Sequence, residues 1–247
     1  MEFIVFFLLT LFAEIIGTIG GFGSSLFFVS LLQFLYDFQT VLALTGILHV
    51  FSNSAKLFLF WKSIDWKLVR WLGISSVLLA IGGAFLTRYV EFEYAKILLG
   101  IFLIVFSIWM LLRPKDQVRA TVTNSIVGGG IAGFLAGFIG TGGAIRGLIL
   151  TAFNLEKNFL VGTSAAIDFG VDLSRSIIYL DSGFLKTTYI TYIPMLIIGA
   201  FLGSYIGKVL LKKISQENFR KIILSFVLLV GISLLVKEAD VIARIFA

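Results

Sequence analysis

The sequence has no cysteine, a single histidine, two prolines and few charged residues, and each shortage excludes a class of protein. Without cysteine there is no disulfide framework, thiol nucleophile or cysteine metal site. One histidine rules out a histidine-rich metal centre, so we expect neither a metal nor a cofactor. Only 14% of the 247 residues are charged. A water-soluble domain carries about 25%, so the chain lacks the surface of a soluble protein.

Apolar residues take the place of the missing charge: 59% of the chain is hydrophobic and the mean hydropathy is +1.04. This excess predicts an all-α polytopic membrane protein, in which each crossing needs about 20 apolar residues. The net charge of +6 lies mainly in short connectors, which is typical of membrane loops, so no nucleic-acid partner is expected. Eight apolar runs are long enough to be considered as membrane segments: 3–35, 40–61, 68–87, 94–112, 124–153, 158–180, 187–210 and 219–236.

Two of these runs, 3–35 and 124–153, are too long for one ordinary crossing, and glycines interrupt each near its middle. The interruptions read GTIGGFGSS at 17–25 and GFIGTGGA at 137–144. Glycine costs about 1 kcal/mol in a helix interior relative to alanine, so such clusters predict unwound backbone. Broken segments at matching positions of two halves are a pointer to a transporter's binding site.

The two halves of the chain correspond, which predicts an internal duplication. Gly17, Gly20 and Gly23 align with Gly137, Gly140 and Gly143 at an offset of 120. His49, Asn53 and Lys56 align with Asp168, Asp172 and Arg175 at an offset of 119. We expect a first repeat at 1–113, a linker at 114–123, a second repeat at 124–236 and a C-terminal tail at 237–247, all in one membrane domain.

The basic residues of the loops bear on how the repeats are oriented. If all eight runs cross, the loop Lys and Arg residues divide 9 to 8 between the two sides. If 3–35 and 124–153 are instead re-entrant hairpins, the same residues divide 12 to 5. The second division favours two inverted repeats, each a Gly-broken re-entrant segment plus three transmembrane helices, with both termini outside. Eight crossings remain the alternative.

Ionisable side chains inside membrane segments are costly and are functional candidates by default. His49, Asn53 and Lys56 lie within about 60° of one another on a helix that turns about 100° per residue. Asp168, Asp172 and Arg175 share one face in the same way. Two such polar faces from inverted halves can meet and enclose a cavity. The complete set of ionisable candidates is Glu14, His49, Lys56, Arg146, Asp168, Asp172 and Arg175.

The glycine loops predict a site for a small anion, because unwound backbone and helix N-termini present N–H donors. Hydroxyls and guanidinium groups near the loops add further donors. The predicted substrate-binding residues are Gly20, Gly23, Ser24, Ser25, Gly140, Thr141, Gly143, Arg146, His49, Asn53 and Arg175. Glu14, Lys56, Asp168 and Asp172 are predicted to compensate charge or to carry a coupling proton.

Structural explanations stand beside these functional ones. Lys56 can extend to the lipid headgroups, Asp172 and Arg175 can form an i,i+3 pair, and His49 can be a hydrogen-bonded core residue. Glu14 can join two helices, and Gly129, Gly133 and Gly137 can serve helix packing.

The second transport hypothesis is a proton- or cation-driven permease that uses Asp168, Asp172 and Glu14. An enzyme is not expected, because HExxH and GxSxG are absent and His49 has no obvious Ser and Asp partners. A purely structural membrane subunit is the last alternative.

Three motifs together resemble the sulfite exporter TauE/SafE family: Glu14 with GTIGGFG, the repeat GFIGTGGA, and TSAAIDF at 163–169. The run IIGAFLGSYIG at 197–207 is also similar to that family, and the resemblance extends from about residue 3 to 236. It implies a permease of the prokaryotic cytoplasmic membrane for a small sulfur-containing anion such as sulfite, sulfoacetate or a related organosulfonate, with export, coupled to ion gradients, as the usual activity. The expected partners are this anion and membrane lipid, and a homodimer is left open.

Overall fold

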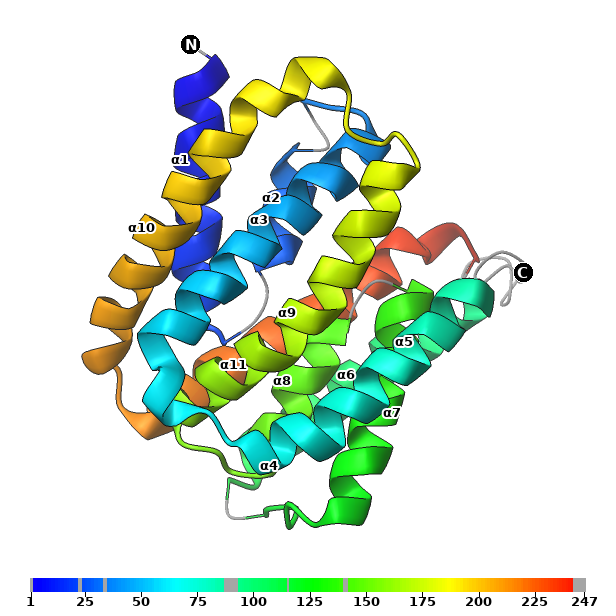
Figure 1. Cartoon of the computed structure of the whole chain (residues 1–247). Coiled ribbons are helices and arrows are strands. Elements are labelled where there is room, and N and C mark those ends of the chain that lie inside the picture. Colours follow the sequence, from blue (N-terminus) through cyan, green and yellow to red (C-terminus); the bar gives the residue numbers. More distant parts are fainter. Residues whose placement is uncertain are drawn as a thin grey trace. The chain divides into compact units, whose positions relative to one another are not determined.

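The computed structural model describes residues 2–21, 24–32, 35–86, 93–114, 116–139 and 142–241, in which every regular element is a helix (Figure 1). The predicted all-α class is therefore confirmed for these residues. In chain order the elements are α1 (Glu2–Ile19), α2 (Ser24–Leu32), α3 (Phe38–Phe60), η1 (Trp61–Ser63), α4 (Trp66–Leu68), η2 (Val69–Gly73), α5 (Ile74–Leu86), α6 (Glu93–Leu112), α7 (Val122–Ile139), α8 (Gly142–Ala152), α9 (Lys157–Asp181), η3 (Thr187–Tyr192), α10 (Ile193–Lys212) and α11 (Gln216–Lys237).

The helices form two compact units, and each unit combines helices from both halves of the sequence. The first unit contains residues Met1–Trp66 and Lys157–Ser215, and the second contains Lys67–Glu156 and Gln216–Ala247. The units thus do not coincide with the two predicted repeats, whose boundaries stay a prediction.

In the first unit, α1 and α10 lie side by side and run in the same direction (Figure 1). Glycines at every fourth position of α10 form the contact face, because a Cβ atom at Gly203 would lie only 2.6 Å from the Cβ of Glu14. Such small residues let two helix backbones approach closely inside a membrane. The matched pairs along the seam are Gly199 with Thr10, Gly203 with Glu14, and Gly207 with Thr18.

The chain turns back on itself between α1 and α2, so the first Gly-broken segment is a helical hairpin. Phe6, near the start of α1, packs on Phe28 of α2 with ring centroids 5.9 Å apart, while Gly17 lies against Ser24 at the turn. Gly21 has a φ of 71°, in the left-handed region that glycine adopts without strain. The predicted helix break at this glycine cluster is confirmed.

Helices α3 and α9 pack antiparallel in the same unit. Gly162, near the start of α9, would place a Cβ atom against the backbone of Ser63 just after α3, whereas Gly46, early in α3, faces Ser176, late in α9. Because these two contacts lie at opposite ends of the helices, α3 and α9 must run in opposite directions. Equivalent helices of the two predicted repeats are therefore direct neighbours.

Asp37 caps the N-terminus of α3 and ties it to the loop before η3. The Thr40 N–H donates to Asp37 Oδ1 at 3.0 Å, and Lys186 Nζ lies 3.0 Å from Oδ2. The pKa of Asp37 is lowered to about 2, mainly by the hydrogen bond from the Thr40 N–H and next by the hydrogen bond from the Lys186 ammonium group. The start of α3 and the segment after α9 thus lie at one end of this unit.

The second unit is built from similar contacts. Helix α5 runs parallel to α7, where Gly133 faces the Ser76 backbone and the Ser76 hydroxyl donates to Gly129 O at 2.8 Å. Helix α7 turns back into α8, since Gly128 near the start of α7 faces Ile149 near the end of α8. Helices α6 and α11 pack antiparallel through Gly100 and Gly231.

Among the described residues, three helices are long and apolar enough to cross a membrane: Gln39–Ser63, Thr187–Lys212 and Gln216–Lys237. Shorter apolar helices include Phe3–Ile19 and Ile97–Leu112. Large apolar side chains face outward, such as Phe58 at 77% and Leu98 at 70% exposure, as a lipid solvent requires. These features agree with a membrane protein, while the number of crossings and the re-entrant course remain predictions.

The glycine seam of the second unit can be tested with Gly133→Ala. The new methyl group would overlap the backbone oxygen of Ser76, so the helices must separate, and we expect a loss of about 2–3 kcal/mol of stability. Gly82→Ala on α5 is the matched control, because no atom lies within 4 Å of its Cβ position. Unfolding in detergent, followed by circular dichroism, measures both; equal unfolding midpoints would contradict the close packing.

Candidate functional site

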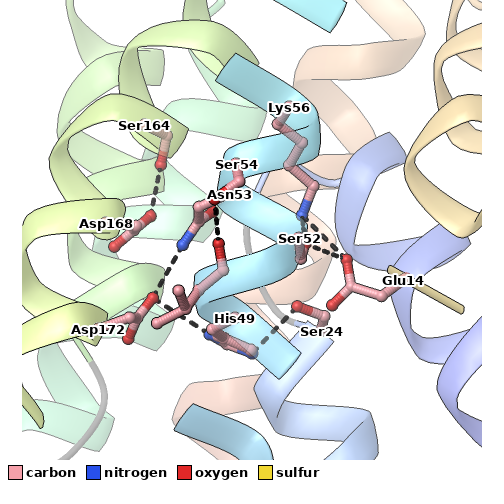
Figure 2. Close-up of polar contacts among 11 residues, drawn as sticks. Glu14, Ser24, His49, Ser52, Asn53, Ser54, Lys56, Ser164, Asp168 and Asp172 are labelled. Carbon is pink, nitrogen blue, oxygen red and sulfur yellow. Dashed lines mark hydrogen bonds and ion pairs between the residues drawn. The ribbon is translucent and has the colours of Figure 1, made fainter. Parts of the chain in front are cut away.

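Helix α3 lies at the centre of a buried polar cluster in the first unit (Figure 2). Four of its residues follow the spacing i, i+3, i+4 and i+7, so their side chains leave one broad face of the helix. Part of this face contacts α1 and part contacts α9. The cluster consists of Glu14 from α1, Ser24 from α2, His49, Ser52, Asn53 and Lys56 from α3, and Ser164, Asp168 and Asp172 from α9.

Glu14 and Lys56 form a buried ion pair between α1 and α3. Lys56 Nζ lies 3.1 Å from Glu14 Oε2 and donates to Ser52 Oγ at 2.7 Å, while the Ser52 hydroxyl donates to the same Glu14 oxygen. The Glu14 side chain is fully buried and that of Lys56 is 8% exposed. Lys56 therefore points into the protein, and its extension to the lipid headgroups is ruled out as an explanation.

His49 joins α3 to two other helices through its two ring nitrogens. Nδ1 lies 3.3 Å from Asp172 Oδ2 on α9, and Nε2 lies 3.2 Å from Ser24 Oγ at the start of α2. Asn53 Nδ2 donates to the same Asp172 oxygen at 2.9 Å. Because an ionised carboxylate only accepts hydrogen bonds, a neutral His49 beside an ionised Asp172 would carry its proton on Nδ1 and accept through Nε2.

This arrangement has the order of a Ser-His-Asp triad, which the sequence analysis did not find. Ser24, His49 and Asp172 are distant in the sequence and meet only because the hairpin turn and α9 both contact the middle of α3. Ser52 and Ser164 were also missed. Ser52 could have been found from its place four residues before Lys56, and Ser164 from its place four residues before Asp168, to which it donates at 3.1 Å.

Arg146 belongs to the second unit, in the first half of α8, and is only 1% exposed. A guanidinium group buried in a membrane segment is costly, which marks it as functional by default. Gly143 lies in the first turn of the same helix. The remaining predicted binding positions fall outside what the structure describes: the residues Gly23, Gly140 and Thr141, and the side chains of Ser25 and Arg175.

Among the described residues, no group of three or more histidine and carboxylate side chains is placed to hold a metal ion. The polar cluster consists of the Glu14–Lys56 ion pair, the Asp172 carboxylate in contact with His49 and Asn53, and hydroxyl groups that hydrogen-bond to these side chains and to Asp168.

The chain is similar to known membrane proteins along most of its length. The model of the family "Sulfite exporter TauE/SafE" matches residues 6–234. The chain belongs to this family. Among curated relatives, "Probable membrane transporter protein MJ0441" of Methanocaldococcus jannaschii is 27% identical, over 90% of this chain and 91% of that protein. "Probable membrane transporter protein YunE" of Bacillus subtilis is 24% identical, over 95% of this chain and 98% of that protein. No solved structure matches the chain.

The family confirms the resemblance found in the sequence and gives the chain a general role as a TauE/SafE membrane transporter. Both relatives carry names of membrane transporters rather than of enzymes.

The ion pair can be tested with Glu14→Gln, which leaves the Lys56 ammonium buried without a counter-charge. We expect a loss of about 3–5 kcal/mol of stability, most of which the double variant Glu14→Gln/Lys56→Met should recover. The control is Lys186→Met, which breaks a pair of nearly the same separation, 3.0 Å, whose lysine is 62% exposed. Unfolding in detergent measures all three variants. If Glu14→Gln and Lys186→Met unfold alike, the buried pair is not a charge-balanced unit.

Proposed function

We propose that the protein is a secondary transporter of a small sulfur-containing oxyanion, such as sulfite, sulfoacetate or a related organosulfonate, that works by alternating access. The observation that carries the proposal is the position of Ser24. This residue starts α2 at a glycine turn, is 4% exposed, and hydrogen-bonds to the middle of α3. A helix N-terminus with a hydroxyl donor is therefore buried beside the middle of the long apolar helix α3, which supports a substrate site within the membrane.

The depth of the hairpin supports a re-entrant course. His49 is near the midpoint of the 23-residue α3, and Ser24 reaches it from the hairpin turn. Helix α2 has nine residues, about 14 Å, which is too short for a hydrocarbon core of about 30 Å. At the other end of the hairpin, Tyr36 packs on Phe6, with ring centroids 6.2 Å apart, so the chain returns to the end from which it started.

The helix directions support inverted repeats. In the predicted duplication α1 corresponds to α7 and α10 to α5, and both α1 with α10 and α7 with α5 pack parallel. The corresponding helices α3 and α9 pack antiparallel, as a two-fold axis in the membrane plane requires. Asn53 also hydrogen-bonds to Asp172, its own counterpart in the other repeat, which is the contact expected close to such an axis.

The basic residues of the first unit support a membrane orientation. Lys157 donates to Leu211 O at 3.0 Å and Lys208 donates to Leu59 O, so the ends of α3 and α10 and the start of α9 lie together. Lys186, paired with Asp37, lies at the opposite end. An excess of lysine marks the cytoplasmic side. The lysines at the excess end are Lys62, Lys157, Lys208, Lys212 and Lys213.

The donors near the two hairpin turns suit an oxyanion. In the first unit, backbone N–H groups near Gly20–Ser25 and the guanidinium group of Arg175 would attract an oxyanion, and in the second unit the start of α8 and the guanidinium group of Arg146 would do so. The family name supplies the sulfur chemistry, since the hydrogen-bond donors of the chain select an oxyanion but not its central atom.

A proton- or cation-coupled permease for another solute, with Asp168, Asp172 and Glu14 as ligands, is the second candidate. The contacts of the carboxylates disfavour a bare cation site. Glu14 is neutralised by Lys56, and Asp172 accepts from both His49 and Asn53. Anion-independent stabilisation by a cation would favour this candidate over the first.

Transport can be tested in proteoliposomes loaded with radiolabelled sulfite or sulfoacetate. Arg146→Ala and Arg175→Ala should each reduce the flux at least tenfold, because each removes a charge that offsets the anion. Arg113→Ala is the matched control, since Arg113 is exposed at the end of α6 and should transport like the wild type. Undiminished flux in both variants would remove Arg146 and Arg175 as charge partners. A wild type that moves no sulfur oxyanion would overturn the proposed function.

The membrane orientation can be tested by cysteine labelling, for which the cysteine-free chain is a natural background. Asp37→Cys and Lys186→Cys should react with an impermeant maleimide from outside, and Ser63→Cys and Lys213→Cys only after permeabilisation. An N-terminal tag should lie on the same side as residue 37. A tag on the opposite side would instead support eight crossings.

A further inference from the structure

We propose that His49 is the proton-binding residue of the transport cycle and that its protonation turns the Ser24 hydroxyl toward the anion. The protein would then carry a proton and the anion in the same direction. This inference rests on the proposed function and adds the coupling ion and the residue that binds it. It follows from how three side chains on three helices share their hydrogen atoms.

Asp172 fixes the hydrogen-bond roles of the neutral imidazole. Its Oδ2 accepts from His49 Nδ1 at 3.3 Å and from Asn53 Nδ2 at 2.9 Å, so the ring proton stays on Nδ1. Nε2 then offers only a lone pair, and Ser24 Oγ, 3.2 Å away, must donate its hydrogen to it. In this state the Ser24 hydroxyl hydrogen is occupied and is withheld from an anion at the start of α2.

Protonation of His49 reverses the direction of the hydrogen bond between its Nε2 atom and Ser24 Oγ. The imidazolium has N–H groups on both nitrogens, so Nε2 now donates to Ser24 Oγ. The serine oxygen accepts this bond, and its own hydrogen becomes available to another acceptor. Ser24 is at the N-terminus of α2, where the backbone N–H groups of the first helical turn have no acceptor within that helix. The hydroxyl and these N–H groups together would bind an oxyanion.

The charges around His49 favour the same coupling. On α9, Asp172 contacts the ring and Asp168 lies one turn away, bound by Ser164; the side chain of Arg175 on this helix is outside the described residues. On α1, Glu14 is balanced by Lys56, and α2 has no titratable residue. A proton on His49 adds a positive charge beside Asp172, so the site repels an approaching anion less when that proton is bound.

Imidazole is the side chain whose charge changes most readily near neutral pH, and His49 is the sole histidine of the chain. Binding linkage is reciprocal, so an anion that binds better to the protonated site also makes proton binding more favourable. The proton and the anion would therefore bind and leave together, so an anion that is transported in either direction would carry a proton with it.

The test uses purified wild type and variants in proteoliposomes that contain a pH-sensitive dye, with labelled sulfoacetate as the probe. Sulfoacetate is fully ionised near neutral pH, so any proton that enters with it is carried by the protein. For the wild type we expect acidification of the lumen on anion entry, and accumulation that rises at least tenfold when the outside is more acidic. His49→Gln should lose both the acidification of the lumen and the response to the pH gradient in whatever anion exchange it retains.

Two further variants separate coupling from folding. Ser24→Ala should raise the KM for sulfoacetate at least tenfold while protons still enter with the anion, and Ser24→Thr should restore the KM. Ser54→Ala, on α3 outside the cluster, should behave like the wild type, because its hydroxyl only donates to Val50 O within the helix. Anion entry without protons in the wild type, or a retained pH response in His49→Gln, would overturn this inference and leave the proposed function intact. No anion transport by the wild type would overturn both.

Discussion

The rest of the structure depends on the internal balance of charges buried around α3. A carboxylate or ammonium group inside a membrane protein has no water to solvate it, so each must find its counter-charge within reach. Glu14 is paired with the Lys56 ammonium, and Asp172 contacts His49 and accepts a hydrogen bond from Asn53. These contacts require α1 and α9 to lie on different parts of the same helix. The polar cluster therefore fixes which helices are neighbours, although the apolar surface would allow other arrangements.

The glycine seams make this balance possible. Gly203 on α10 allows α1 to approach so closely that Glu14 is held at the level of Ser52 and Lys56. The glycine turn after α1 acts in the same way for Ser24, because it reverses the chain at the depth of His49. Close helix packing and the polar site are thus consequences of the same small residues. A larger residue in the seam would displace a charge from its partner as well as create a clash.

Much of the architecture could be predicted from the sequence because apolar run length and glycine clusters are local properties. The break between Ile19 and Ser24 and the shared face of His49 and Asn53 are examples. The partners of these residues could not be predicted in the same way. Whether Lys56 reaches the lipid headgroups or Glu14 depends on how α1 packs on α3, which no local pattern encodes. For the same reason Ser24 and Asp172 were not recognised as the two partners of His49.

The proposed duplication would explain why the matching polar residues differ between the halves. Close to a two-fold axis each residue meets its own counterpart, so an exact duplicate would place Asp against Asp or Asn against Asn. Two facing carboxylates repel each other, and one of them would have to be protonated. With Asn53 opposite Asp172 the contact becomes an amide donor on a carboxylate, at 2.9 Å, which needs no extra proton. In the proposed transport cycle the adjacent imidazole of His49 is then the group that takes up and releases a proton. Divergence of the two proposed repeats would thus have replaced a symmetric repulsion by an asymmetric proton site.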